Sequence, residues 1–345
     1  MSVWRRPDGD LVRGLDFSRR AMPYMMKGRN ESVFYFDENV QLPKADAWLR
    51  AFNVAHPGMS ADIFHLALWA VRDCMVRWPT MNRFVMGGRL YQRREITFTY
   101  AVKRRLKDTG SGGADMATVK RTFPPDEAFE DLVAAIADQT RQERFGGPTH
   151  TDRELRVILK LPGVLRRVFV AAMRVLDAYG VLPRKWIDGD PMYTSAFLAH
   201  MASFGMPAGY HHLYEYGTAG VFVVLGRPTT DPGSPTSGPD RRRTMRVTFS
   251  FDERTEDGMI AWRSIQHFKR ILEDPGAVAG LEGLTEAPEV STTGVNPGPD
   301  SGSAAADAPE PPGARIASNG HQGGALDASG GVRHDAAAGA AGGSE

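Results

Sequence analysis

Residues 244–275, TMRVTFSFDERTEDGMIAWRSIQHFKRILEDP, combine the pattern of a strand, a charged turn and the pattern of a helix. From residue 244 to 251 polar and apolar side chains alternate, which predicts a strand with one buried face. From residue 260 to 272 apolar side chains recur mostly at steps of three and four, which predicts an amphipathic helix that stops at Asp274-Pro275. The apolar positions are Met245, Val247, Phe249 and Phe251 in the strand, and Ile260, Trp262, Ile265, Phe268, Ile271 and Leu272 in the helix.

The turn between them, residues 252–258 (DERTEDG), holds five ionisable side chains. A hydrophobic strand and a hydrophobic helix flank it on either side. Charged groups that a packed scaffold holds in place are candidates for a functional site.

This turn resembles the motif D-H-R-x-x-D-G at the end of the catalytic domain of the 2-oxoacid dehydrogenase dihydrolipoyl acyltransferases (E2), which are relatives of chloramphenicol acetyltransferase. Asp252, Arg254, Asp257 and Gly258 match the motif, and Glu253 stands where the family has a histidine. In that family the histidine is the general base that deprotonates the acyl acceptor. The resemblance therefore makes Glu253 and Asp257 candidate catalytic residues, with a mainly structural part for Asp257. It also implies a structural turn formed by Asp252, Arg254 and Gly258.

A second family segment, ending in S-F-G, resembles Ser203-Phe204-Gly205. This alignment sets Ala199 at the family's oxyanion-stabilising Ser or Thr, and His200 at the neighbouring Asn. His211 and His212 follow the same segment. Because an imidazole titrates near neutral pH, His200, His211 and His212 are further candidates for the base.

Two interpretations of Glu253 remain open. It can act as a base if burial disfavours its charged form, and the neighbouring carboxylates would act in the same direction. Arg254 would act against this. Alternatively, Glu253 is a salt-bridged residue that fixes the turn.

The remaining pattern predicts an α/β chain. Strands are expected near residues 32–36, 89–103, 116–123, 193–199 and 220–225, and helices near 45–52, from Ser60 to the stop at Pro79, and after Pro124. The glycine-rich segment DTGSGGAD is expected to join two of the strands as a hairpin. Arg29 and Asn30 are expected in a solvated turn, with a ligand contact as the alternative. This order resembles a two-layer sandwich with a mixed β-sheet, as in chloramphenicol acetyltransferase.

Composition divides the chain into an N-terminal arm (1–20), an acyltransferase-like domain (21–275) and a tail (276–345). The tail is poor in aromatic residues and rich in Ala, Gly, Ser and Pro, so it is predicted to be disordered. Residues 228–243, rich in Pro, Gly and Ser, are predicted to form a flexible loop inside the domain. No lipoyl-attachment domain is recognised, so an acyl acceptor would be a lipoyl-carrying partner protein or a small molecule.

Residues 163–179 predict a basic amphipathic helix, in which Arg166, Arg167 and Arg174 lie apart from the apolar side chains. Such a helix can lie on a membrane surface. Packing against the domain or at a subunit interface is the preferred interpretation.

Charge and cysteine content exclude other classes of protein. A formal net charge of +1 gives no electrostatic reason to expect nucleic acid as a partner. The single cysteine, Cys74, excludes an intrachain disulfide and a cysteine-cluster metal site, and no metal site is expected. Neither a signal peptide nor a membrane-spanning run is recognised, so a cytoplasmic protein is expected.

The resemblance implies a stand-alone coenzyme A-dependent acyltransferase that moves an acyl group between coenzyme A and a thiol, hydroxyl or amine. It also implies a homotrimer or larger assembly, with active sites at subunit interfaces and a channel that admits coenzyme A. The alternative is a catalytically inactive trimeric scaffold or a regulatory protein that binds acyl-CoA, because the residues at positions 253 and 199 both differ from the family's.

Overall fold

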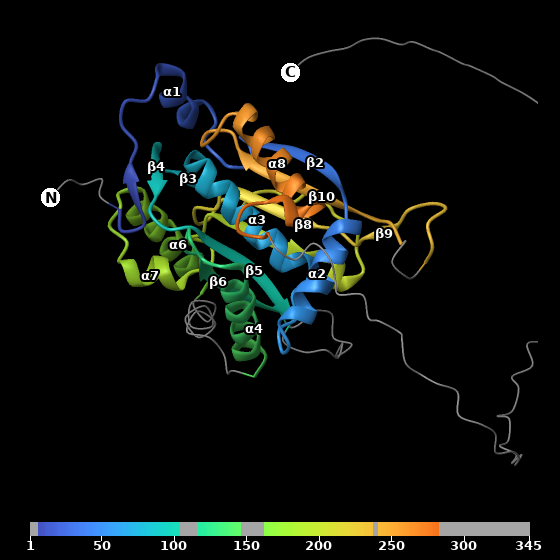
Figure 1. Cartoon of the computed structure of the whole chain (residues 1–345). Helices are drawn as coiled ribbons and strands as arrows, with labels where there is room; N and C mark the ends of the chain where they lie inside the picture. Colours follow the sequence, from blue (N-terminus) through green and yellow to red (C-terminus); the bar gives the residue numbers. More distant parts are fainter. Residues whose placement is uncertain (1–5, 104–115, 146–161, 237–240, 283–345) are drawn as a thin grey trace, which may run out of the picture. The chain divides into compact units, whose positions relative to one another are not determined.

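Strand β10 (Arg243–Asp252) lies inside the larger of two β-sheets (Figure 1). The computed structural model describes residues 6–103, 116–145, 162–236 and 241–282. In the larger sheet the strand order is β2-β10-β8-β7-β5-β6, and β9 also pairs with β10. β10 is antiparallel to β2 and β8, while β8, β7 and β5 run parallel to one another. The predicted α/β class with a mixed sheet is confirmed.

The helices and strands of the described residues follow one another in an order close to the predicted one. Most boundaries differ from the predicted ones by a few residues. In chain order they are β1 Gly9–Leu11, α1 Phe17–Met25, β2 Val33–Gln41, α2 Pro43–Ala55, α3 Ile63–Arg77, β3 Arg83–Met86, β4 Arg89–Arg93, β5 Thr97–Lys103, β6 Met116–Thr122, α4 Phe129–Phe145, α6 Gly163–Ala178, α7 Arg184–Gly189, β7 Ala196–His200, β8 Val221–Leu225, β9 Thr229–Thr230, β10, and α8 Gly258–Glu273.

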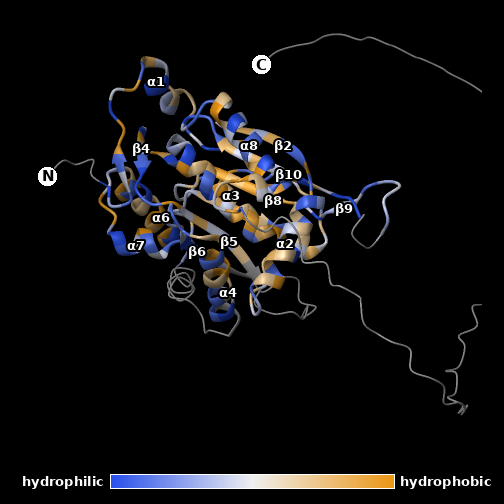
Figure 2. Ribbon diagram, in the orientation of Figure 1, coloured by the Kyte–Doolittle hydropathy of each residue, from blue (hydrophilic) through white to orange (hydrophobic). Residues whose placement is uncertain are grey.

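Helices α2, α3, α4 and α8 form a layer on one face of the larger sheet, and α3 is the central helix of this layer. Eleven of the fifteen residues of α3 are buried, which explains its broad apolar stripe. Figure 2 shows the apolar residues gathered where these helices meet β8 and β10. The helix begins at Asp62, whose carboxylate accepts the amides of Phe64 and His65, so the expected cap at Ser60 is wrong.

The opposite face of the sheet is covered by the segment that follows β7 rather than by helices. Thr248 and Ser250 of β10 point to this face, and their hydroxyls donate to the carbonyls of Gly209 and His211 at 2.8 and 2.5 Å. A second apolar cluster fills this side and includes Phe197 and Phe222. The segment that carries the histidine pair is thereby attached to the strand that ends at the charged turn.

The second sheet has the order β1-β4-β3 and includes the N-terminal residues. The run 89–103, predicted as one strand, is two strands in different sheets, because the chain bends between β4 and β5. Residues 9–11 pair with β4, and Arg6 is buried between Asp8 and Asp177. Residues 6–20 therefore include a sheet strand and are not simply an arm.

Three predicted connections are described in part. β5 and β6 pair as the antiparallel hairpin that was expected, and the glycine-rich residues between them lie outside the described residues. In the predicted loop 228–243, β9 pairs with β10, and residues 237–240 are not described. Residues 283–345 of the predicted tail are likewise outside the described residues.

The beginning of the predicted tail packs against the domain. Val278 and Leu281 are buried in the main core, and the indole nitrogen of Trp48 donates to the carbonyl of Leu281 at 3.1 Å. Two isolated apolar side chains carry too little signal in a composition average to be recognised. Ordered packing thus reaches past the boundary predicted at residue 275.

The substitution Leu281→Ala should lower the free energy of unfolding by about 2–5 kcal/mol, because it removes a buried side chain from the core. The matched control is Val76→Ala on the exposed side of α3, which should change it by less than about 0.5 kcal/mol. Denaturant unfolding followed by circular dichroism measures both. Equal effects would show that residue 281 does not belong to the core.

Candidate functional site

The charged turn after β10 is built around the buried carboxylate of Asp252. Arg254 donates to its Oδ1 from Nε at 2.8 Å and to its Oδ2 from Nη2 at 2.7 Å. Ser32 donates to Oδ1 at 3.1 Å, and the Nε of Arg29 lies 4.0 Å from Oδ2. Asp252 is 1% exposed, so the turn is held by an ion pair inside the protein.

The two arginines connect this carboxylate to distant parts of the chain. Arg254 donates to the carbonyls of Met26 and Lys27, just after α1. Arg29 donates to the carbonyls of Tyr214 and Glu215, in the segment that follows the histidine pair. One buried cluster therefore fixes the turn, the loop before β2 and the histidine segment.

The solvated turn expected at Arg29 and Asn30 is wrong for Arg29. Its side chain is buried, and burial lowers its pKa. Asn30 is exposed. The backbone amides of Arg29 and Asn30 both donate to the carboxylate of Glu215. This loop is therefore a structural part of the site.

Glu253 has a fixed backbone and an exposed side chain. Its amide donates to the carbonyl of Ser32, and its own carbonyl accepts from Nη1 of Arg19, both at 2.9 Å. The side chain lies in solvent. The described part of the chain does not supply the burial that a carboxylate base needs at this position.

Asp257 connects the charged turn to helix α8. It is the N-cap of α8, and its carboxylate accepts the amide of Ile260 at 2.9 Å. Gly258, the first residue of α8, has open space where a side chain would begin. Packing within the single chain therefore does not explain this glycine.

Glu256 is a further residue of the charged turn whose side chain is buried. This carboxyl is 4% exposed, and its Oε1 accepts the amide of Asp257 at 2.9 Å. Its Oε2 is buried and makes no hydrogen bond within the described residues. Burial raises the pKa of Glu256. A charged run does not reveal which of its members turns inward, so no sequence signal identifies this residue.

The three candidate histidines are not together. Successive side chains of a strand point to opposite faces, so Ala199 and His200 of β7 are on different sides of the sheet. His200 stacks on Phe64 of α3, with ring centroids 5.2 Å apart, on the helical side. Burial lowers the pKa of His200, and the nearby Asp62 opposes this.

His211 and His212 lie on the other side, with Ala199. The ring of His211 stacks on Phe222 with centroids 3.9 Å apart, and on His212 at 4.9 Å. Burial lowers the pKa of His211, so the imidazole is mostly neutral at pH 7. Tyr214 packs beside both rings and belongs to the same apolar cluster as Ala199. The structure thus places the histidine pair, but not His200, on the face that bears Ala199.

Within the described residues no group of three or more His, Cys, Asp or Glu side chains could hold a metal ion. Cys74 is buried.

Comparison with known proteins gives matches among solved structures. Neither a protein-family model nor a curated protein sequence matches the chain. A probable dihydrolipoamide acetyltransferase from Listeria monocytogenes is similar at 14% identity, over 78% of this chain and 98% of that one, with a TM-score of 0.47. The truncated catalytic core of a 2-oxoacid dehydrogenase complex from Thermoplasma acidophilum matches at 16% identity over 78% and 100%, with a TM-score of 0.46.

A chloramphenicol acetyltransferase is also similar, at 13% identity over 77% of this chain and 98% of that chain, with a TM-score of 0.42. These structures are of the two kinds of protein that residues 252–258 resemble.

The substitution Asp252→Asn should lower the free energy of unfolding by about 3–5 kcal/mol, because it leaves two buried guanidinium groups without a full counter-charge. Asp131→Asn, on the exposed side of α4, is the matched control and should have an effect below about 0.5 kcal/mol. Urea unfolding measures the difference. A small effect at residue 252 would show that the buried pair does not hold the turn.

The substitution Glu256→Gln should remove a pH-dependent destabilisation. The folded pKa of Glu256 is raised above 4.5, so this group's contribution to stability falls as pH rises through the window between 4.5 and the folded value. The slope is at most about 1.4 kcal/mol per pH unit for one group. The unfolding free energy of both proteins is measured from below pH 4.5 to neutral pH. The value for the variant minus the value for the wild type should increase as pH rises. A difference that does not change with pH would contradict the burial of this acid.

Proposed function

We propose that this chain is a coenzyme A-dependent acyltransferase in which Glu253 is the general base. The observation that carries the proposal is the fixed presentation of this residue. Hydrogen bonds hold its backbone on both sides, and the adjacent residues form a buried ion pair. The backbone of Glu253 is thereby kept at one place at the end of β10, and its side chain extends from this fixed point, as the placement of a catalytic group requires.

The chemistry is acyl transfer from a thioester. The carboxylate of Glu253 takes the proton of a thiol, hydroxyl or amine acceptor as that atom attacks the acyl carbonyl. The bond between carbon and sulfur then breaks, and the sulfur of coenzyme A leaves and recovers the proton. A donor must stabilise the oxyanion that forms between these steps.

Ala199 has no hydroxyl to serve as that donor. His211 and His212 are on the same face of the sheet as Ala199, and His211 is mostly neutral at pH 7. A neutral imidazole can donate from one nitrogen and accept a proton at the other. The pair is thus the second candidate set for proton transfer, and His200, on the helical side, is the third.

Assembly would complete the site. A homotrimer, or a larger assembly, would cover Glu253 with a neighbouring subunit and disfavour its charged form. The acceptor would then be a lipoyl group on a partner protein or a small molecule that shares the site with coenzyme A.

A second function is favoured by a specific observation. Position 199 lacks the hydroxyl and Glu253 is open to solvent, so the single chain has neither a buried base nor the expected oxyanion donor. A protein of this kind would bind acyl-CoA without turnover and act as an inactive scaffold or a regulatory protein.

Calorimetric titration with coenzyme A and acetyl-CoA, followed by a thiol-release assay, tests the two functions. Glu253→Gln should leave binding unchanged and lower turnover by about 100-fold or more, because a positioned base contributes this much. Asp131→Asn is the matched control and should keep full activity.

His211→Gln, His212→Gln and His200→Gln, made singly, assign the base if Glu253→Gln remains active. Binding without turnover in the wild type would favour the inactive protein. The absence of binding would contradict both proposed functions, the acyltransferase and the inactive protein that binds acyl-CoA.

A further inference from the structure

Helix α6 is attached to the domain by one narrow side. Asp177 is its only buried residue, and it accepts hydrogen bonds from Arg6 and from the hydroxyl of Tyr193. Met173, one turn earlier, packs against a small cluster that includes Tyr193. The turn between β3 and β4 lies against the end of the helix, since a Cβ added at Gly87 would be 2.4 Å from the carbonyl of Ala178. These contacts attach the C-terminal end of α6 to the domain.

The rest of α6 leaves large apolar side chains in solvent. Val164, Val168 and Val175 are 73%, 60% and 54% exposed, and Tyr179, just after the helix, is 51% exposed. At spacings of four and seven residues, these side chains share one face. Packing of this helix against the domain or a subunit is the preferred interpretation of the sequence, but within the described residues nothing covers this face. A contiguous exposed apolar surface of this kind marks an interaction site.

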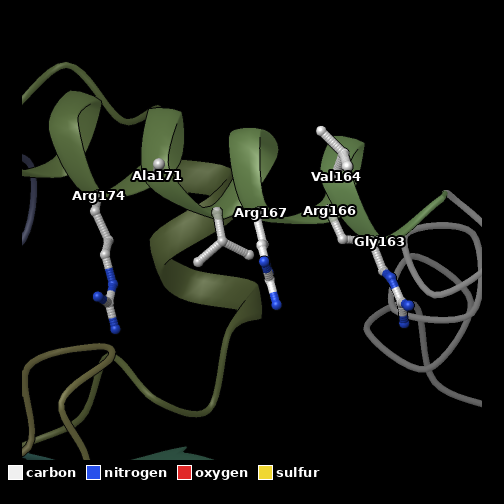
Figure 3. Close-up of a pocket in the computed structure, with 7 residues that line it drawn as sticks. Gly163, Val164, Arg166, Arg167, Ala171 and Arg174 are labelled. Atoms are coloured by element: carbon white, nitrogen blue, oxygen red, sulfur yellow. The ribbon is translucent and has the colours of Figure 1, made fainter.

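Charge distinguishes among the possible partners. The exposed charged residues of α6 are Arg166, Arg167 and Arg174, while its one acid, Asp177, is buried. Figure 3 shows the three arginines extending to one side of the helix and Val164 to the other. A symmetric contact between two copies through the valines would bury the apolar face but leave the three arginines without acidic partners, because α6 has no exposed acid. A surface that is both anionic and apolar fits the whole helix.

We propose that α6 binds an anionic lipid surface. The helix would lie in the plane of the membrane, with its valines in the boundary between headgroups and acyl chains and its arginines at the phosphates. Tyr179 and the exposed Trp186 of the adjoining helix α7 are amphipathic aromatics of the type that favours this boundary. Within the described residues no helix is long and apolar enough to cross a membrane, so the contact is a surface contact.

Co-sedimentation of the full chain with lipid vesicles tests the proposal and needs no catalytic activity. The protein should sediment with phosphatidylcholine vesicles that contain phosphatidylglycerol, less with pure phosphatidylcholine, and less as salt rises. Arg166→Gln and Arg167→Gln should each weaken binding by about fivefold. Val168→Asp should abolish it, because it places a charge in the apolar face.

The matched controls are Arg263→Gln on α8 and Val76→Asp on α3, both at exposed positions, which should bind as the wild type does. Thermal melting checks that each variant is folded, and the arginine variants remain informative if Val168→Asp does not fold. Equal sedimentation with both kinds of vesicle, or unchanged binding by the α6 variants, would overturn the proposal. So would sedimentation velocity without lipid showing an oligomer that Val168→Asp dissociates, since α6 would then be a subunit contact.

Discussion

The buried carboxylate of Asp252, between the guanidinium groups of Arg254 and Arg29, is the interaction on which the site depends. An ion pair removed from water must be fully satisfied, because an unpaired buried charge is strongly destabilising. Satisfying this one requires the end of β10, the loop before β2 and the segment after the histidine pair to be in place together. These three segments are far apart in the chain, so the site forms only with the folded domain.

The same cluster explains how an exposed residue can have a defined position. Glu253 belongs to a turn whose flanking residues are buried, and its backbone is hydrogen-bonded on both sides. The sheet then determines which side chains share a face with one another. Because β7 alternates, His200 is separated from Ala199 and from His211, although the first two are adjacent in sequence.

The sequence predicts the periodic elements well, since β10, α3 and α8 each repeat a pattern over many residues. It does not predict the contact between Arg29 and Asp252, which joins distant positions and leaves no periodic signal. For a related reason the sequence does not show that Glu256 turns inward, because the five ionisable residues between positions 252 and 257 look equally solvated. The bend that divides residues 89–103 between two sheets and the packing of Leu281 also depend on tertiary contacts.

Among the described residues, Glu253 and the apolar face of α6 are both open to water, and the energetic consequences of this exposure differ. An exposed carboxylate such as Glu253 is well hydrated and requires no partner, so its exposure alone does not imply an interface. The apolar face of α6 is different, because water contact with its valines is unfavourable and burial would stabilise it. Burial of the α6 valines would therefore stabilise the protein, whereas burial of Glu253 would serve only its proposed role as a base. If a neighbouring subunit provides the cover at Glu253, the strength of the base depends on assembly, whereas the lipid contact at α6 depends only on the single chain.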